Sequence, residues 1–206
     1  NRSTALYINS FGTSAVDKCI FDKNFNRGFF KTGSRLKLTN SVFCNNEIFS
    51  TGTASITDSD DYSDTVLNCT FANNNSRDTL NAGNGLAGVA LVMGLQLPNS
   101  TVVANCIFKN NTSRGRLLPG APYLDFSFTG LTTGNPNSYL TIDNNAGKTV
   151  YSLNTYLAGS NNILPDGILF KDINNAAGAD GIYFTADDGI QQATSSSGIN
   201  KGLSSR

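Results

Sequence analysis

A nine-residue pattern occurs four times in this chain and constrains its fold more than any other feature. It starts with an aliphatic residue, carries Asn, Cys and Phe at fixed places and ends on Asn; its copies are residues 16–24, 38–46, 66–74 and 103–111. Lys18 replaces the first Asn once, and Ser41 replaces the Cys once. The central Phe stands at positions 21, 43, 71 and 108, so successive copies are 22, 28 and 37 residues apart. Repeats at such periods indicate a solenoid or a similar array.

The order of residue types within the pattern predicts two short strands and two corners. Apolar or β-branched residues alternate before the first Asn, as at Leu36 and Leu38, which is typical of a strand with one buried face. Asn tolerates the left-handed backbone of a sharp corner. Cys and Phe, two residues apart, point to one side of a second strand. The pattern therefore predicts one coil of a parallel β-helix, with an ordinary antiparallel β-sandwich as the alternative.

Stacking of coils predicts where the repeated side chains lie. The four Phe residues are expected to run up the interior, and stacked Asn side chains are expected to satisfy backbone groups at the corners. Cys19, Cys69 and Cys106 share one repeat position, so we expect them to be small buried hydrophobic residues with free thiols. Cys44 is out of phase and is expected to face the other way.

The segments between the repeat copies vary in length and suggest a binding face. Residues 28–31 are expected to form a third side of the first coil. Later copies are separated by longer inserts, and we interpret residues 47–63, 75–100 and 112–139 as loops at one corner of the stack. Loop insertions in a solenoid gather on one side, which is often the side that binds ligands.

The regular repeat ends before the chain does. Residues 139–144 indicate a fifth, weaker coil in which Ile142 takes the place of Leu38. We therefore divide the chain into β-helix coils with loop insertions, 1–163, and a closing segment of the same domain, 164–206. Residues 168–171 and 189–192 resemble short strands. Because the end of a β-helix exposes unpaired strand groups, residues 164–203 are expected to cover it.

These motifs resemble a known group of proteins. The Asn-Cys-x-Phe-x-x-Asn coils are similar to the repeats of bacterial secreted and surface proteins in the pectate-lyase-like superfamily. Residues 178–190 and 197–202 resemble segments that close such domains. The resemblance implies an all-β fold, a right-handed parallel β-helix with three strands per coil. It implies no single activity, because the superfamily holds lyases, hydrolases, adhesins and inert stalks.

Composition excludes several classes of function. The chain has no His, which excludes Ser-His-Asp and Cys-His sites and His-based metal sites. The formal net charge is zero, so nothing indicates binding to nucleic acid or to an acidic membrane. No apolar run reaches the length of a membrane span. We expect a secreted or cell-surface protein and interpret the sequence as part of a larger exported chain.

Two groups of carboxylates are candidate calcium ligands. One lies in the first long insert and the other in the closing segment: Asp58, Asp60, Asp61 and Asp64; and Asp180, Asp187 and Asp188. Calcium prefers several oxygen ligands on a flexible loop. The alternative is an acidic, solvated turn, since Asp is common in turns. Neither spacing matches an EF-hand loop.

The third insert carries the candidate ligand-binding residues. They are aromatic side chains suited to stacking on sugar rings and nearby cations: Tyr123, Phe126, Phe128, Arg114 and Arg116. The alternatives are local core beneath a long loop and solvated loop cations. No pair of carboxylates is marked out for glycoside cleavage. We therefore expect an adhesin-like module that binds polysaccharide or another cell-surface component without cleaving it. A polysaccharide lyase or glycoside hydrolase using the same loops, and a structural stalk, remain open.

Overall fold

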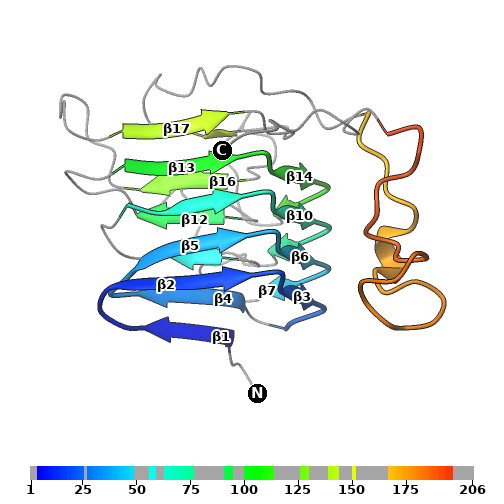
Figure 1. Ribbon diagram of the computed structural model, residues 1–206, viewed down its shortest axis with the longest axis horizontal. Coiled ribbons are helices and arrows are strands. Elements are labelled where there is room, and N and C mark those ends of the chain that lie inside the picture. Colours follow the sequence, from blue (N-terminus) through cyan, green and yellow to red (C-terminus); the bar gives the residue numbers. More distant parts are fainter. Residues whose placement is uncertain are drawn as a thin grey trace.

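The computed structural model describes ten parts of the chain: residues 4–25, 27–48, 56–58, 63–76, 91–94, 100–113, 126–129, 139–143, 150–151 and 167–196. Strands from successive repeats lie one above another in these parts, as Figure 1 shows. Every pairing between named strands is parallel, so the antiparallel alternative is wrong. The protein is all-β, with parallel sheets of stacked strands, an arrangement consistent with a β-helix.

The strands form four sheets. Sheet A contains β1 (Thr4–Asn9), β4 (Arg27–Thr32), β8 (Ile56–Asp58), β12 (Leu91–Gly94), β16 (Phe126–Thr129) and β18 (Val150–Tyr151). Sheet B contains β2 (Thr13–Asp17), β5 (Arg35–Thr39), β9 (Thr65–Leu67), β13 (Ser100–Ala104) and β17 (Tyr139–Asp143). Sheet C contains β3 (Ile20–Asp22), β6 (Val42–Cys44), β10 (Thr70–Ala72) and β14 (Ile107–Lys109). Sheet D contains β7 (Glu47–Ile48), β11 (Asn75–Ser76) and β15 (Thr112–Ser113).

The register joins equivalent positions of the repeat. In sheet C, Phe43 pairs with both Phe21 and Phe71, and Phe71 pairs with Phe108. In sheet B, Val103 pairs with Ile142, which confirms the expected fifth copy of that strand. Each full repeat visits sheets A, B, C and D in turn. The three expected strands are thus accompanied by a fourth, the two-residue segment in sheet D that follows the closing Asn.

The prediction that each long insert is a single loop at one corner is wrong. A strand of sheet A lies inside every one of the three ranges: β8 within 47–63, β12 within 75–100 and β16 within 112–139. Each insert is therefore divided by a strand of sheet A. These strands have only three or four residues, so their alternation is too short to stand out within a long insert.

Both corners of the pattern use left-handed backbone, as expected, but the second is displaced by one residue. At the first corner φ is 51° at Asn40, 56° at Asn68 and 55° at Asn105. At the second corner the left-handed residue precedes the closing Asn: φ is 56° at Asn45 and 54° at Asn73. The closing Asn is therefore free of the turn and places its side chain in the interior.

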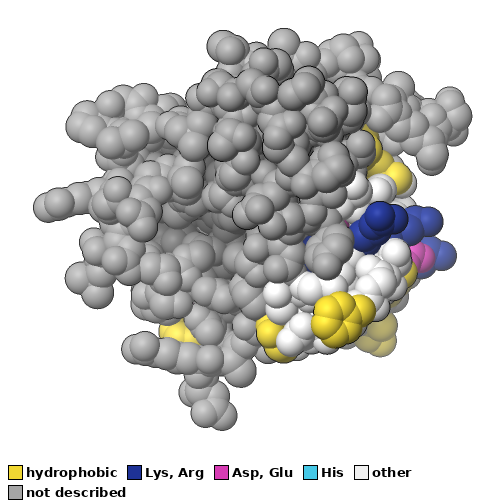
Figure 2. Space-filling model, turned by 90° about the vertical axis from the view of Figure 1, so that its left-hand side faces the viewer, with side chains coloured by type: hydrophobic (Ala, Val, Ile, Leu, Met, Phe, Trp, Pro, Cys, Tyr) yellow, Lys and Arg dark blue, Asp and Glu magenta, His cyan; other side chains and the backbone are white. Residues whose placement is uncertain are grey.

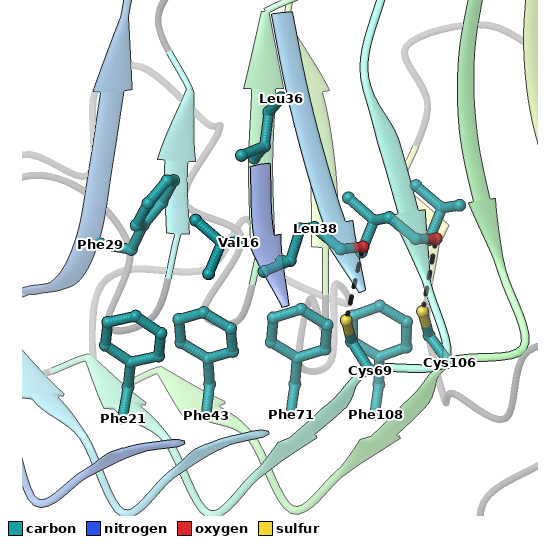
Figure 3. Packing of buried hydrophobic residues seen from close by; sticks show 12 residues of the cluster. Val16, Phe21, Phe29, Leu36, Leu38, Phe43, Cys69, Phe71, Cys106 and Phe108 are labelled. Carbon is teal, nitrogen blue, oxygen red and sulfur yellow. Dashed lines mark hydrogen bonds between the residues drawn. The ribbon is translucent and has the colours of Figure 1, made fainter. Parts of the chain in front are cut away.

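Aromatic rings fill the interior as predicted. The ring centroids of Phe21 and Phe43 are 4.4 Å apart, those of Phe43 and Phe71 are 5.2 Å apart, and those of Phe71 and Phe108 are 4.9 Å apart. Interplanar angles of 12° or less make this one continuous stack (Figure 3). Aliphatic residues of sheet B cover it from one side: Val16, Leu36, Leu38, Val66 and Val103.

A ladder of buried Asn side chains lines the second corner. The Oδ1 of Asn74 accepts hydrogen bonds from the backbone N–H and the Nδ2 of Asn46, at 3.2 and 2.9 Å. The Nδ2 of Asn74 donates to the carbonyl oxygen of Phe43 at 3.0 Å and to the Oδ1 of Asn111 at 2.9 Å. Because the same bonds recur one repeat earlier, at Asn24 and Asn46, the ladder satisfies corner amides as the sequence predicted.

All four cysteines are free, which confirms the prediction of free thiols at Cys19, Cys69 and Cys106. Cys69 and Cys106 are buried as expected, whereas Cys19 is only half-buried. The Sγ atoms of Cys69 and Cys106 donate to the carbonyl oxygens of Leu38 and Val66 in the preceding repeat (Figure 3). Cys44 follows Phe43 and so faces the other side of sheet C, where its Sγ donates to the Oδ1 of Asp22 at 3.2 Å. Side chains stacked in register point in parallel, which keeps the thiols from bridging.

We expect alkylation under denaturing, non-reducing conditions to modify all four cysteines of each chain. In the native protein, Cys44 and Cys106 should resist the reagent, because burial raises the pKa of both thiols and shields them. Intact-mass measurement reports both results. Two alkylations, or none, after denaturation would show a disulfide and contradict the assignment.

The described part of the closing segment lies along the side of the stack, next to sheet C (Figure 1). The hydroxyl of Tyr183 donates to the Oδ2 of Asp22 at 2.6 Å, and the Nδ2 of Asn45 donates to the carbonyl oxygen of Ile173 at 3.2 Å. This cover accounts for the complete burial of Cys44 and Ala72 on the outer face of sheet C. These contacts are with the side of the stack, so the prediction that this segment covers the end of the stack is wrong for its described residues.

The closing segment has little regular structure where it is described. It contains the 3₁₀ turn η3 (Ile173–Asn175) and one antiparallel bridge between Phe170 and Gln192. The two short strands expected at 168–171 and 189–192 are thus reduced to that single bridge. No helix in the described part of the chain is long and apolar enough to cross a membrane.

Candidate functional site

An open groove on the outer face of sheet B is the candidate site that the described residues form. Its volume is ≈ 430 Å³, and it is lined by Ala15, Asp17, Lys37, Thr39, Asn40, Leu67 and Asn68. The strands β2, β5 and β9 place these residues outward because they alternate with the buried Val16, Leu38 and Val66. The groove therefore presents hydrogen-bonding groups from three successive repeats on one surface.

A second Asn ladder, exposed rather than buried, forms one side of this groove. The Nδ2 of Asn105 donates to the Oδ1 of Asn68, and the Nδ2 of Asn68 donates to the Oδ1 of Asn40, both at 3.2 Å. The Nδ2 of Asn40 in turn donates to the Oδ1 of Asp17 at 2.7 Å. Each bond uses one N–H of an amide that has two. The ladder thus holds exposed amides in a fixed row along the stack.

Asp17 lies at the end of this row of Asn side chains and is the negatively charged member of it. Its Oδ1 also accepts a hydrogen bond from the hydroxyl of Thr39. The hydrogen bonds from Thr39 and Asn40 lower the pKa of the Asp17 carboxyl, because they stabilise its ionised form. The carboxyl consequently stays ionised at pH values where an ordinary Asp begins to take up a proton. The ionised Asp17 carboxylate can accept hydrogen bonds, but it has no proton to donate.

Cations stand beside the carboxylate on the same face. Lys37 and Arg35 lie on β5 with exposed side chains, and Lys37 lines the groove. Figure 2 shows lysine and arginine side chains gathered next to polar surface and an acidic side chain at the right-hand edge of the view. The groove thus offers a cation, an anion and neutral amides within one small area.

The predicted aromatic and basic ligand-binding residues are described only in part. Tyr123, Arg114 and Arg116 lie outside the described residues, as do the side chains of Phe126 and Phe128. The backbone of β16 puts Phe126 in register with Leu91, which pairs with Ile56, which pairs with the buried Phe29. Sugar stacking by this group stays a prediction.

The three carboxylates of the closing segment form hydrogen bonds within their own loop. The Oδ2 of Asp187 accepts from the backbone N–H of Ala179 at 2.7 Å, and hydrogen bonds from Thr185 and Ala179 lower its pKa. The Oδ2 of Asp188 accepts from the N–H of Phe184 at 2.7 Å, and the Oδ1 of Asp180 accepts from the N–H of Ile182 at 2.8 Å. Backbone donors thus occupy oxygens that a calcium ion would need.

Two further observations describe this loop. Gly189 follows Asp188 because a Cβ at that position would collide with the backbone oxygens of Asp172 and Asn175. No group of three acidic or cysteine side chains suited to a metal ion occurs within the described residues. The geometry matches the acidic turn that the sequence left as the alternative, and calcium binding here stays a prediction.

Asp64, grouped by sequence with the acidic insert, lies inside the stack. Its side chain is completely buried and forms an ion pair with Lys31, whose Nζ lies 3.3 Å from Oδ1. The predicted calcium site was expected in a solvent-exposed loop, and Asp64 is shielded from solvent. Asp60 and Asp61 and the side chain of Asp58 are outside the described residues, so a calcium site formed by them stays a prediction.

Sequence reasoning missed the groove and the buried ion pair. A signal for the groove was present, because the outward residues of the sheet B strands alternate with the aliphatic ones that were used to predict burial. Alternation with Phe29 was a signal for an inward Lys31, but lysine side chains are normally solvated, so its burial was not expected. No known protein family, curated protein or solved structure matches this chain.

Proposed function

We propose that this chain is an exported, adhesin-like module that binds polysaccharide, or another component of a cell surface, without cleaving it. The proposal includes a right-handed parallel β-helix of the pectate-lyase-like type, with three main strands per coil. It places the protein outside the cell, as part of a larger exported chain. The groove on sheet B is the observation that carries the binding function, and the long inserts are a second surface for the same ligand.

Repetition of hydrogen-bonding groups in the groove supports a polymeric ligand. Neighbouring strands lie about 4.8 Å apart, so Asn40, Asn68 and Asn105 repeat at that spacing along the stack. This spacing is close to the length of one ring in an extended polysaccharide. Exposed amides and hydroxyls match sugar hydroxyls, while Lys37 matches the carboxylate of an acidic sugar. Preorganisation of the row by its own hydrogen bonds lowers the entropy lost on binding.

The chemistry of the groove supports binding rather than cleavage. Glycoside hydrolysis requires two carboxyl groups, one of them a proton donor with a raised pKa. Among the residues that line the groove, Asp17 is the one carboxylate, and its pKa is lowered by the hydrogen bonds from Thr39 and Asn40. An ionised Asp17 can orient a sugar hydroxyl but cannot protonate a leaving group.

A matched pair of lysine and arginine variants tests the groove. We expect Lys37→Gln to weaken binding to an acidic polysaccharide such as pectin or alginate about tenfold, which corresponds to about 1.4 kcal/mol. Arg35→Gln removes the same charge from the same strand at an exposed position that does not line the groove. It should change the affinity less than about twofold, or about 0.4 kcal/mol. Affinity electrophoresis or calorimetry with a panel of acidic and neutral glycans measures both.

The same panel separates the competing functions. Unsaturated products or new reducing ends during incubation would identify a lyase or a hydrolase and overturn the proposal. Equal weakening by both variants would indicate unspecific attraction between charges instead of a groove. An absence of both binding and turnover across the panel would favour a structural stalk.

A further inference from the structure

Sheet C carries the same arrangement of polar side chains as the groove on sheet B. The Oδ1 of Asp22 accepts hydrogen bonds from the Sγ of Cys44 and the Nδ2 of Asn45, at 3.2 and 2.8 Å. The Nδ2 of Asn73, one repeat further on, donates to the Oδ1 of Asn45 at 3.4 Å. On sheet B the same bonds join four groove residues in the equivalent positions: Asp17, Thr39, Asn40 and Asn68. A row of exposed amides that ends on a carboxylate therefore occurs at both corners of the pattern.

The two carboxylates also share the same backbone surroundings. Each is followed by a lysine with left-handed backbone, Lys18 with φ of 52° and Lys23 with φ of 54°. Both lysines occupy corner positions that carry Asn in the later copies of the pattern. The two amide rows consequently begin at the same repeat and run in the same direction along the stack. Equal backbone and equal partners mean that both rows present the same hydrogen-bonding groups outward.

Tyr183 of the closing segment binds the second oxygen of the carboxylate on sheet C. Its hydroxyl donates to the Oδ2 of Asp22 at 2.6 Å, and the amide row itself does not use that oxygen. The neighbours Ile182 and Phe184 are 60% and 70% exposed, so apolar packing by these side chains adds little to the contact. At the equivalent place on sheet B, the Oδ2 of Asp17 has no partner among the described residues.

Two amides of the row on sheet C bind the closing segment through their second N–H group. The Nδ2 of Asn45 donates to the carbonyl oxygen of Ile173, and the Nδ2 of Asn73 donates to the Oδ1 of Asn174, both at 3.2 Å. Together with the carboxylate, these amides place one bond to the segment in each of three successive repeats. A polymer lying along the groove on sheet B would be held in the same way, one group per repeat.

We propose that the amide row on sheet C is a second ligand-binding site and that the closing segment occupies it as an internal ligand. The proposal rests on the function proposed for the groove on sheet B. A polysaccharide offers hydroxyl donors and oxygen acceptors, which are the groups that the segment supplies to the carboxylate and the amides. Hydrogen bonds that water or another ligand can replace contribute little net free energy. The segment is therefore displaceable by a ligand with the same groups.

Covalent attachment of the closing segment sets the condition for its release. A tethered group competes at a high effective concentration, so the segment keeps sheet C occupied when ligand is scarce. A dense ligand surface shifts the competition and exposes the second row. One chain then holds a polymer at two faces of the stack, and two linked contacts bind more tightly than either alone. The closing segment thus makes the strength of binding depend on how much ligand is present.

The thiol of Cys44 reports whether the closing segment is in place, because it is completely buried on the outer face of sheet C. The double variant Tyr183→Phe with Asn174→Ala removes two of the bonds that hold the segment. We expect native-state alkylation of Cys44, followed by mass spectrometry, to become at least about tenfold faster in this variant. Cys106, buried in the interior, should stay unreactive and serves as the control for unfolding.

A short acidic oligosaccharide prepared from pectin is the probe for the second site. It should slow the alkylation of Cys44 in the double variant and bind that variant at one more site per chain than the wild type. Tyr7→Phe removes the same hydroxyl from an exposed position on β1 and should leave Cys44 protected.

Three results would overturn the inference. Unchanged alkylation of Cys44 in the double variant would show that these bonds do not hold the segment. Equal acceleration at Cys106 would show that the segment leaves only when the chain unfolds. An exposed Cys44 that the oligosaccharide fails to protect would show that sheet C is not a ligand site. The function proposed for the groove is judged separately, by the dependence on Lys37 of binding of the same oligosaccharide to the wild-type protein.

Discussion

Replacing Phe71 with Ala is expected to lower the free energy of unfolding by about 3–5 kcal/mol. The Phe71 side chain is completely buried and stacks on Phe43 on one side and on Phe108 on the other. Its removal takes away apolar area and leaves a cavity in the middle of a column of rings. Regular backbone pairing above and below the site limits collapse of the cavity. Denaturant unfolding followed by far-UV circular dichroism measures the loss.

Phe11 provides the matched control, because its side chain is 97% exposed. Phe11→Ala removes the same chemical group from the surface and should change the free energy of unfolding by less than about 0.5 kcal/mol. If Phe71→Ala cost less than about 1 kcal/mol, the interior stack would not be a main source of stability, and the placement of the ring would be wrong.

Replacing Asn74 with Ala is expected to cost about 2–4 kcal/mol, although Asn74 is polar and Ala is a small hydrophobic residue. The change deprives the buried backbone N–H of Asn46 of its acceptor and the carbonyl oxygen of Phe43 of the Nδ2 donor. A buried polar group left without its partner costs about 1–3 kcal/mol, and the change also removes the hydrogen bonds that Asn74 makes to Nδ2 of Asn46 and Oδ1 of Asn111. Equilibrium unfolding in denaturant again provides the measurement.

The variant Asn68→Gly is a control that distinguishes the stability contribution of the buried Asn ladder from that of the exposed one. Asn68 makes a similar amide-to-amide bond to Asn40, but its side chain is exposed, so water replaces the lost partner. Glycine tolerates the left-handed φ of 56° at this corner, so the backbone is not strained. We expect a cost below about 1 kcal/mol. Equal losses for the two variants would mean that burial of the closing Asn does not determine its contribution.

The repeated part of the chain was predictable because its residues report on local geometry. Alternation of Leu36 and Leu38 with polar residues predicted a strand with one buried face, and both are buried in β5. The Asn that follows predicted a left-handed corner, and Asn40 has φ of 51°. Cys44 stands three positions later in the pattern than Cys19 and Cys69, directly after Phe43, and was correctly expected on the opposite face. Such signals need only a few neighbouring residues.

The inserts and the site were less predictable because they depend on what the stack brings together. The strands of sheet A inside the inserts are recognisable through their pairing with β4 and with one another, which local alternation does not reveal. Lys31 and Asp64 are paired although 33 positions separate them. Alternation with Phe29 and Val66 places both on the inward face, but charged residues are rarely buried, so their pairing could not be expected from either local sequence. The groove likewise combines residues of three repeats whose outward positions become neighbours only in the sheet.

The sequence by itself thus determined the strands, the corners and the columns of like residues, because each repeat copy carries those instructions within nine positions. Tertiary structure alone decided which side of the stack the closing segment covers, which acidic residue is buried and where an exposed amide row meets a carboxylate. Tyr183 reaches Asp22 across 161 positions, a contact that no periodic pattern encodes. The physical reason is that alternation specifies whether a residue faces inward or outward. Its partner on that face depends on which distant segments the folded chain brings next to it.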